Sequence, residues 1–83
     1  MKAKILVTLK KTVLDPQGQT ILQAVRTLGY ETIHEIRQGK YFEITLDDSV
    51  NPDDARAQME QLARDVLSNP VLEEYNVLLE ESS

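Results

Sequence analysis

The sequence predicts an α+β fold with the element order β-α-β-β-α-β, and three observations predict it. Some segments alternate apolar and polar residues, as strands with one buried face do. Two longer segments repeat apolar residues at helical spacing. Each of these two follows a capping residue and a proline, in Asp15-Pro16 and in Asn51-Pro52, which is typical of a helix start.

Residues 2–10 form the first predicted strand, and residues 17–28 form the first predicted helix. The inward face of the strand is apolar and consists of Ala3, Ile5, Val7 and Leu9. The helix has an apolar stripe that consists of Ile21, Leu22, Val25 and Leu28. Gly29 is expected to end this helix, because glycine adopts positive φ at little cost.

Residues 31–38 are predicted as the second strand, although Ile33 and Ile36 have opposite parity and cannot share one face. A bulge or an edge position would resolve this conflict. Gly39 is expected in a tight hairpin turn. The third strand, residues 41–46, then alternates strictly, with Phe42, Ile44 and Leu46 on its buried face.

Asn51 is expected to cap the second helix, and Ser68-Asn69-Pro70 is expected to end it. Its apolar stripe consists of Ala55, Met59, Leu62, Ala63, Val66 and Leu67. Residues 72–80 form the last predicted strand, in which Tyr75, Val77 and Leu79 share one face.

This order predicts a ferredoxin-like sandwich, in which both helices cover one face of a four-stranded antiparallel sheet. Right-handed crossovers place the first and third strands in the centre. We expect a single domain over residues 1–83. The other sheet face would stay bare and would carry Leu6, Thr8, Tyr41, Glu43, Thr45 and Leu78. Apolar residues on such a face indicate self-association or docking.

Composition excludes several classes of protein. The net charge is −5, which argues against binding to a nucleic-acid backbone. The chain has no cysteine, so it has neither disulfides nor thiolate metal sites, which fits the cytoplasm. It has no apolar run long enough to predict a membrane span.

Candidate catalytic groups are few. His34 is the only histidine and has no evident partner, so we interpret it as an exposed strand residue. Asp47-Asp48 and Asp53-Asp54 are better explained as loop and cap residues than as a cation site. We therefore predict no catalytic, cofactor-binding or metal-binding residue in this chain.

Interface residues can be proposed from charge and residue type. Four cations lie near strand ends, against the acidic total, and two tyrosines are amphipathic aromatics of the kind that interfaces favour. The predicted interface consists of Lys10, Lys11, Arg37, Lys40, Tyr41 and Tyr75.

Three segments of the chain carry a resemblance to a known family. They are Val7 to Lys10 with Val13 to Gly18, then Leu28-Gly29-Tyr30 with Ile36 to Tyr41, then Asn69 to Tyr75. In this order and spacing they resemble the PurS family, the small subunit of phosphoribosylformylglycinamidine synthase.

The resemblance implies a cytoplasmic, non-catalytic subunit of a ligase in de novo purine biosynthesis. Its implied partners are a large synthetase subunit, a glutaminase subunit and further copies of itself, as a homodimer or higher oligomer. The resemblance places ATP and magnesium on the large subunit. It implies that this chain bridges the two larger subunits and supports ammonia transfer for the ATP-dependent amidation of formylglycinamide ribonucleotide.

Two other hypotheses remain open at this point. The chain could be a free-standing ferredoxin-like module that binds a regulatory small molecule, in which case such a ligand would raise its melting temperature. An enzyme acting alone would need a buried titratable cluster, which the sequence does not suggest.

Overall fold

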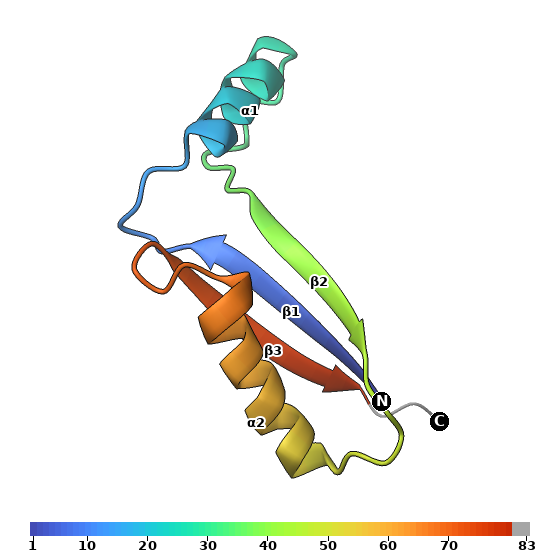
Figure 1. The fold of residues 1–83 in the computed structure, drawn as a ribbon. Coiled ribbons are helices and arrows are strands. Elements are labelled where there is room, and N and C mark those ends of the chain that lie inside the picture. Colours follow the sequence, from blue (N-terminus) through green and yellow to red (C-terminus); the bar gives the residue numbers. More distant parts are fainter. Residues whose placement is uncertain (81–83) are drawn as a thin grey trace.

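The computed structural model describes residues 1–80 of the 83-residue chain. The element order is β1 (Lys2–Leu9), α1 (Pro16–Thr27), β2 (Gly39–Thr45), α2 (Pro52–Leu62), a π-helical segment η1 (Ala63–Leu67) that continues α2, and β3 (Glu73–Glu80). The strands lie side by side with α2 against one face, whereas α1 stands beyond one end of the sheet (Figure 1).

The sheet has the order β2-β1-β3, and both strand pairs are antiparallel. Ile5, in the middle of β1, lies opposite Phe42 of β2 and Val77 of β3. The first strand is therefore central, as the sequence predicts. The third predicted strand, observed as β2, lies at an edge, so its predicted central position was wrong. The inward-facing residues of all three strands lie on one face, where α2 packs.

The core lies between this face and the helical segment from α2 to η1. Ala3, Ile5 and Val7 are fully buried in β1, and Ala55 and Ala63 are fully buried on the helical side. Met59 and Val77 complete the buried cluster. The helical segment packs on β3 and β1, and it leaves the face of β2 largely uncovered. Phe42, Ile44 and Leu46 are consequently only half-buried.

Both helix starts and the glycine stop are confirmed. The Asp15 side chain accepts a hydrogen bond from the Gly18 backbone amide, and Asn51 Oδ1 accepts one from the Asp54 amide at 2.8 Å. Gly29 has a φ of 101°, the left-handed conformation that favours glycine just past a helix end. Ser68 is extended and ends η1. Val66 is 70% exposed, so the predicted apolar stripe was wrong at that residue.

The predicted four-stranded sheet is wrong in one respect, because residues 31–38 form no strand. Ile33 and Ile36 are both half-buried in an irregular segment that runs back along α1. The Arg26 guanidinium donates two hydrogen bonds of 3.2 Å to the Ile33 carbonyl and holds the segment there. Because this segment is not a strand, Ile33 and Ile36 can both be half-buried despite their opposite parity.

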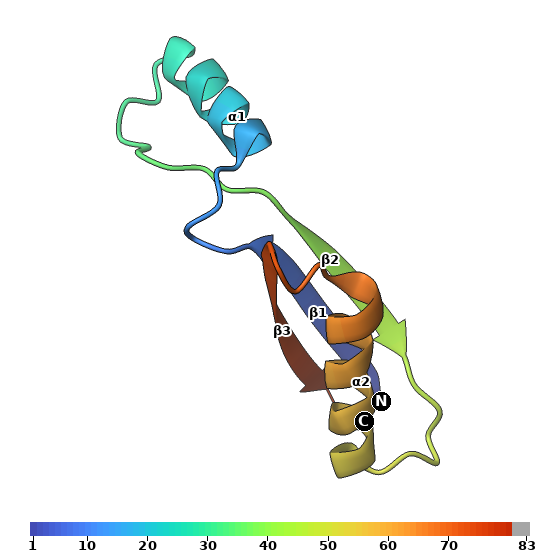
Figure 2. The ribbon, with the colours of Figure 1, turned by 60° about the vertical axis from the view of Figure 1, so that its left-hand side comes forward.

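The prediction that two helices cover the sheet is also wrong for this chain. Helix α1 makes no substantial interface with any other helix or strand, and it points away from the sheet in both views (Figures 1 and 2). The radius of gyration is 16.3 Å, whereas a compact chain of this length would have about 12 Å. The molecule is therefore elongated, with principal extents of 51 × 31 × 14 Å.

Gly39 matters for a reason other than the predicted hairpin. It opens β2 opposite Thr8 and does not adopt positive φ. A Cβ at Gly39 would lie 2.6 Å from the Val7 carbonyl oxygen. The close approach of two strands therefore requires glycine here.

The second sheet face is bare, as the sequence predicts. Leu6, Tyr41 and Leu78 are each between 41% and 52% exposed on it. Around them, Lys4 pairs with Glu80 at 2.6 Å and Lys2 pairs with Glu43 at 3.3 Å. Among residues 1–80, no helix is both long enough and apolar enough to cross a membrane.

Candidate interaction surface

The segment between β1 and β2, residues 10–38, projects from the sheet and is called the arm below. It consists of the connection that follows β1, helix α1, and the irregular return segment that follows α1 (Figure 2). The return segment passes close to the first turn of α1, because a Cβ at Gly18 would lie 2.2 Å from the Ile36 carbonyl oxygen. Leu22, Val25, Ile33 and Ile36 are the half-buried apolar residues of this small two-layered unit.

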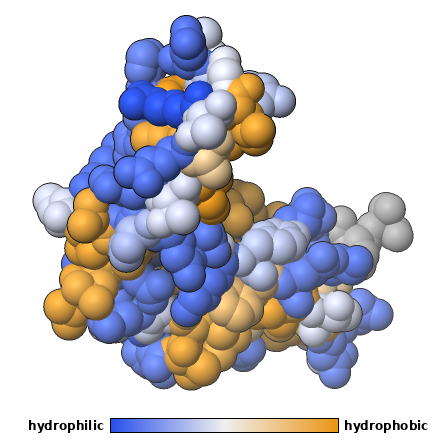
Figure 3. All heavy atoms as spheres, turned by 90° about the horizontal axis from the view of Figure 1, so that it is seen from above, coloured by the Kyte–Doolittle hydropathy of each residue, from blue (hydrophilic) through white to orange (hydrophobic). Residues whose placement is uncertain are grey.

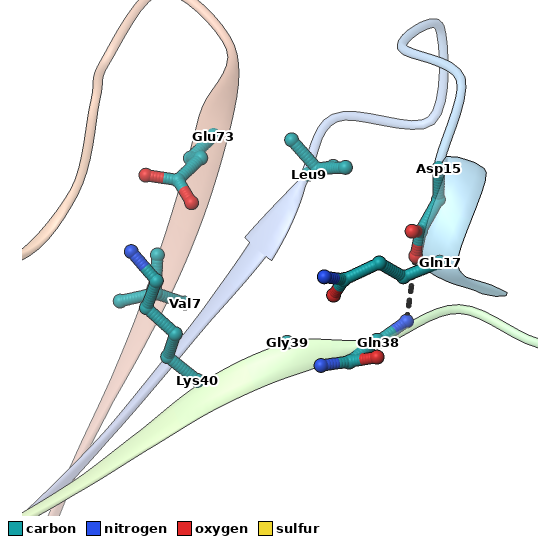
Figure 4. Close-up of a pocket in the computed structure, with 8 residues that line it drawn as sticks. All are labelled: Val7, Leu9, Asp15, Gln17, Gln38, Gly39, Lys40 and Glu73. Carbon is teal, nitrogen blue, oxygen red and sulfur yellow. Dashed lines mark hydrogen bonds between the residues drawn. The ribbon is translucent and has the colours of Figure 1, made fainter.

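Asp15 joins the two ends of the arm. The residue is buried, with 6% of its surface exposed. Oδ1 accepts a hydrogen bond of 2.9 Å from the Gly18 amide, and Oδ2 accepts one of 2.7 Å from the Gln38 amide (Figure 4). One carboxylate thus caps α1 and fixes the point where the chain returns to β2.

Arg37 strengthens the same junction. Its guanidinium donates hydrogen bonds of 3.0 Å to the carbonyl oxygens of both Lys10 and Val13. The outgoing and returning parts of the chain are therefore tied together by side-chain to backbone contacts at the base of the arm. Arg37 was predicted as an interface residue, and the structure shows that its guanidinium positions the arm.

The hydrogen bonds from the Gln38 and Gly18 amides, in that order of importance, hold the pKa of Asp15 below its ordinary value of 3.8. Because the pKa of Asp15 is lower in the folded chain than in the unfolded chain, the ionised carboxylate stabilises the arm base at pH values above the unfolded pKa. This stabilisation is lost as the pH falls through the folded pKa. We expect the Gln38 and Gly18 amide resonances to shift together below about pH 4 in an NMR titration.

The matched variant for this titration is Asp15→Asn, which keeps the shape of the side chain and removes the titration. Its Gln38 and Gly18 resonances should not follow an acid transition at this pH. If the variant shows the same low-pH shift as the parent chain, Asp15 is not the group responsible.

A cleft of about 180 Å³ with mixed polar and apolar walls lies where the arm meets the sheet (Figure 4). The Lys40 ammonium and the Glu73 carboxylate point toward the same space from β2 and β3. Val7 and Leu9 form its apolar floor, and Gln17 and Gln38 reach it from the arm side. The cleft is small and open, and it connects the two parts of the molecule.

The predicted interface residues are spread over three places. Lys10, Lys11 and Arg37 lie at the arm base, and Lys40 lines the cleft. Tyr41 lies on the bare sheet face opposite Leu6, whereas Tyr75 is half-buried on the covered face against the core. The structure therefore does not bring the six residues into one patch.

The arm carries an apolar surface that sequence reasoning did not single out. Leu14, Leu28 and Tyr30 are 66%, 76% and 58% exposed, and Ile21 is 41% exposed. Apolar side chains reach the surface in several separate patches when the molecule is viewed from above the arm (Figure 3). The sequence feature that could have indicated this surface is the scarcity of charged residues in the helix, since Arg26 is the only charged residue of α1.

The acidic pairs behave as loop and cap residues. Asp47 accepts a hydrogen bond from the Ser49 amide, and Asp54 accepts one from the Asn51 side chain. Within the described residues, no group of three or more histidine, aspartate or glutamate side chains could hold a metal ion. His34 is exposed as predicted, but it lies in the irregular return segment and not in a strand.

Fold and surface together define a small α+β protein whose prominent features are exposed apolar residues on the arm and on the bare sheet face. Residues 2–81 match the family model of PurS, phosphoribosylformylglycinamidine (FGAM) synthase. The chain belongs to the PurS family, and it is a subunit of this ligase of purine biosynthesis.

Relatives support this family membership over nearly the whole chain. The PurS subunit of Mycobacterium leprae is 40% identical over 79 residues, which cover 95% of each chain. The crystal structure of PurS from Methanocaldococcus jannaschii is 30% identical, with a TM-score of 0.88 and coverage of 99% of this chain and 98% of the other. A chain in the structure of PurLQS from Thermotoga maritima is 28% identical, with a TM-score of 0.74 and coverage of 93% of each chain.

Proposed function

We propose that this chain is a non-catalytic assembly subunit that joins the large synthetase subunit PurL to the glutaminase subunit PurQ. The observation that carries this proposal is the similarity to a chain of the Thermotoga maritima PurLQS structure over 93% of both chains. The exposed apolar residues of the arm and of the bare sheet face are surfaces that such a role would use.

Chemistry is divided among the subunits in this proposal. The glutaminase subunit releases ammonia from glutamine, and the large subunit binds ATP and magnesium and amidates formylglycinamide ribonucleotide. This chain holds the two in a geometry that favours ammonia transfer, in the cytoplasm. One residue of each acidic pair is engaged locally, Asp47 with the Ser49 amide and Asp54 with the Asn51 side chain, which suits a structural role.

We further propose the bare sheet face as one of the surfaces that meet a larger subunit. Leu6, Tyr41 and Leu78 form its apolar centre, and the Lys4–Glu80 and Lys2–Glu43 pairs border it. An apolar centre with a polar border is the usual organisation of a protein interface.

Reconstitution of the ligase with and without this chain tests the proposal. Omitting the chain from a mixture with the PurL and PurQ of the same organism should lower the glutamine-dependent rate by at least about tenfold, because ammonia would escape before it is used. The rate is measured as ADP released in the presence of formylglycinamide ribonucleotide.

An ammonium salt in place of glutamine is the control, since it bypasses transfer between subunits. A preserved ammonium-dependent rate would assign the loss to transfer, whereas an equal loss of both rates would assign it to assembly of an active synthetase. A glutamine-dependent rate that does not change when the chain is omitted would overturn the proposal.

A further inference from the structure

The cleft between the arm and the sheet contains two opposite charges that are directed at one space. The Lys40 ammonium points into it from β2, and the Glu73 carboxylate points into it from β3 (Figure 4). Among residues 1–80, Lys40 forms no ion pair, whereas Lys2 and Lys4 of β1 each pair with a glutamate. Each of the two groups in the cleft can therefore bind an ionic group of a ligand.

The strand register explains why these two charges lie apart. Lys40 is opposite Val7 of β1, and Glu73 is opposite Leu9 of β1. Val7 and Leu9 are two positions apart, so all four side chains lie on the same face of the sheet. Because β1 runs between β2 and β3, the backbones that carry the two charges are about 10 Å apart. The apolar side chains of β1 form the floor of the gap between them.

Both walls of the cleft are held by backbone contacts. Glu73 Oε1 accepts a hydrogen bond of 2.7 Å from the Asn69 amide, which fixes this carboxylate beside its own strand and leaves Oε2 for a ligand. On the arm side, the Gln38 amide is fixed by its hydrogen bond to Asp15. The side chains of Gln17 and Gln38 line this wall. The charged groups thus come from the sheet, and the two carboxamides come from the arm.

The lining groups define the chemistry of a ligand. A simple anion would be attracted by Lys40 and repelled by Glu73, and a simple cation would meet the reverse. Only a ligand that carries both charges satisfies both groups, as a zwitterionic α-amino acid does. A carboxamide can donate hydrogen bonds to two other carboxamides and accept hydrogen bonds from them. The volume of about 180 Å³ is below the range of drug-sized ligands and restricts the site to a small molecule.

We propose that this cleft binds a small zwitterionic α-amino acid with a carboxamide side chain. Its α-carboxylate lies against Lys40, and its α-ammonium lies against Glu73. Its side-chain carboxamide forms hydrogen bonds with Gln17 and Gln38, and its methylene groups lie over the apolar floor. Such a ligand contacts arm and sheet at once and fixes one relative to the other. The proposal is independent of the assembly role, because it concerns a site within the single chain.

An NMR titration of the ¹⁵N-labelled chain with L-glutamine tests the site. We expect saturable shifts of the Gln38, Gly39, Lys40 and Glu73 amides, with a Kd of about 1 mM for so small a ligand in an open cleft. Lys40→Met should weaken binding by at least about tenfold, because it removes the partner of the α-carboxylate. The matched control is Lys11→Met, which removes an exposed cation of the arm base outside the cleft and should leave the Kd unchanged.

Two analogues assign each charge of the ligand to its partner. Glutaramate lacks the α-ammonium of glutamine, and 4-aminobutanamide lacks the α-carboxylate. The parent chain should bind L-glutamine at least about tenfold more tightly than either analogue. Lys40→Met should lose the preference over 4-aminobutanamide and keep the preference over glutaramate. Glu73→Gln, which keeps an acceptor for the Asn69 amide, should show the reverse.

Several results would overturn the proposal. One is a parent chain without saturable shifts, and another is a set of shifts that lies outside the cleft. A third is a parent chain that binds all three molecules equally. The last is a variant of Lys40 or Glu73 that weakens all three equally, since this pattern indicates a deformed cleft and no direct contact with the ligand charge.

Discussion

Replacing Ile5 by alanine is expected to lower the free energy of unfolding by about 2–5 kcal/mol, which threatens the fold of so short a chain. Ile5 is fully buried at the centre of β1, between Phe42 and Val77. Truncation removes three methyl or methylene groups and leaves a cavity under the helical segment. Urea denaturation followed by circular dichroism, at one fixed chain concentration, measures the loss.

Two neighbours serve as comparisons for Ile5→Ala. Leu6→Ala lies on the bare face and should cost far less, because Leu6 is already 41% exposed. Phe42→Ala should cost less than Ile5→Ala, because Phe42 is only half-buried against the core. Equal losses for Ile5→Ala and Leu6→Ala would contradict the assignment of the two sheet faces.

Substituting Gly18 by alanine is expected to destabilise the arm by about 1–3 kcal/mol. This expected loss of stability is opposite to the usual effect of the substitution, because alanine in place of glycine normally stabilises a helix by up to about 1 kcal/mol. Here the added Cβ would lie 2.2 Å from the Ile36 carbonyl oxygen and 2.9 Å from Asp15 Oδ2. The return segment would have to move away, and the hydrogen bond from the Gln38 amide to Asp15 would lengthen.

Amide hydrogen exchange reports this effect locally. In Gly18→Ala the Gln38 amide should exchange faster, whereas β1 amides should keep their protection. Gln23→Ala is the matched control, since it changes the same helix at an exposed residue. Unchanged Gln38 protection in Gly18→Ala would show that the return segment does not pass against α1 as described.

Local signals predicted most of the individual elements. Asp15-Pro16 and Asn51-Pro52 marked both helix starts, and strict alternation marked β2 and its buried side. These features depend on residues close in sequence, so they can be read without knowing the tertiary structure. The family resemblance was likewise readable from three short segments.

The position of α1 could not be predicted in the same way. The apolar stripe that contains Ile21 and Leu28 is identical whether the helix covers its own sheet or that of another molecule. Residues 31–38 failed as a strand because the segment follows α1, and Ile33 and Ile36 bury themselves there. The opposite parity of Ile33 and Ile36 conflicted with a regular strand. No local feature of the sequence, however, indicated that the segment runs back along α1.

The candidate site was predicted only in part. The bare face with Leu6, Tyr41 and Leu78 followed from alternation and is present. Arg37 was chosen for its charge, and its contacts with the Lys10 and Val13 carbonyls depend on residues more than twenty positions away. Contacts between a side chain and a distant part of the backbone leave no periodic signal in a sequence.

The arm leaves and re-enters the sheet at a single place, because Thr8 lies opposite Gly39 at the ends of two adjacent antiparallel strands. The arm is thus an insertion between two strands that would otherwise form a simple β-hairpin. Residues could be gained or lost at the tip around Gly29 without shifting the register of any strand. The reach of the projection can therefore vary between organisms independently of the scaffold that bears it.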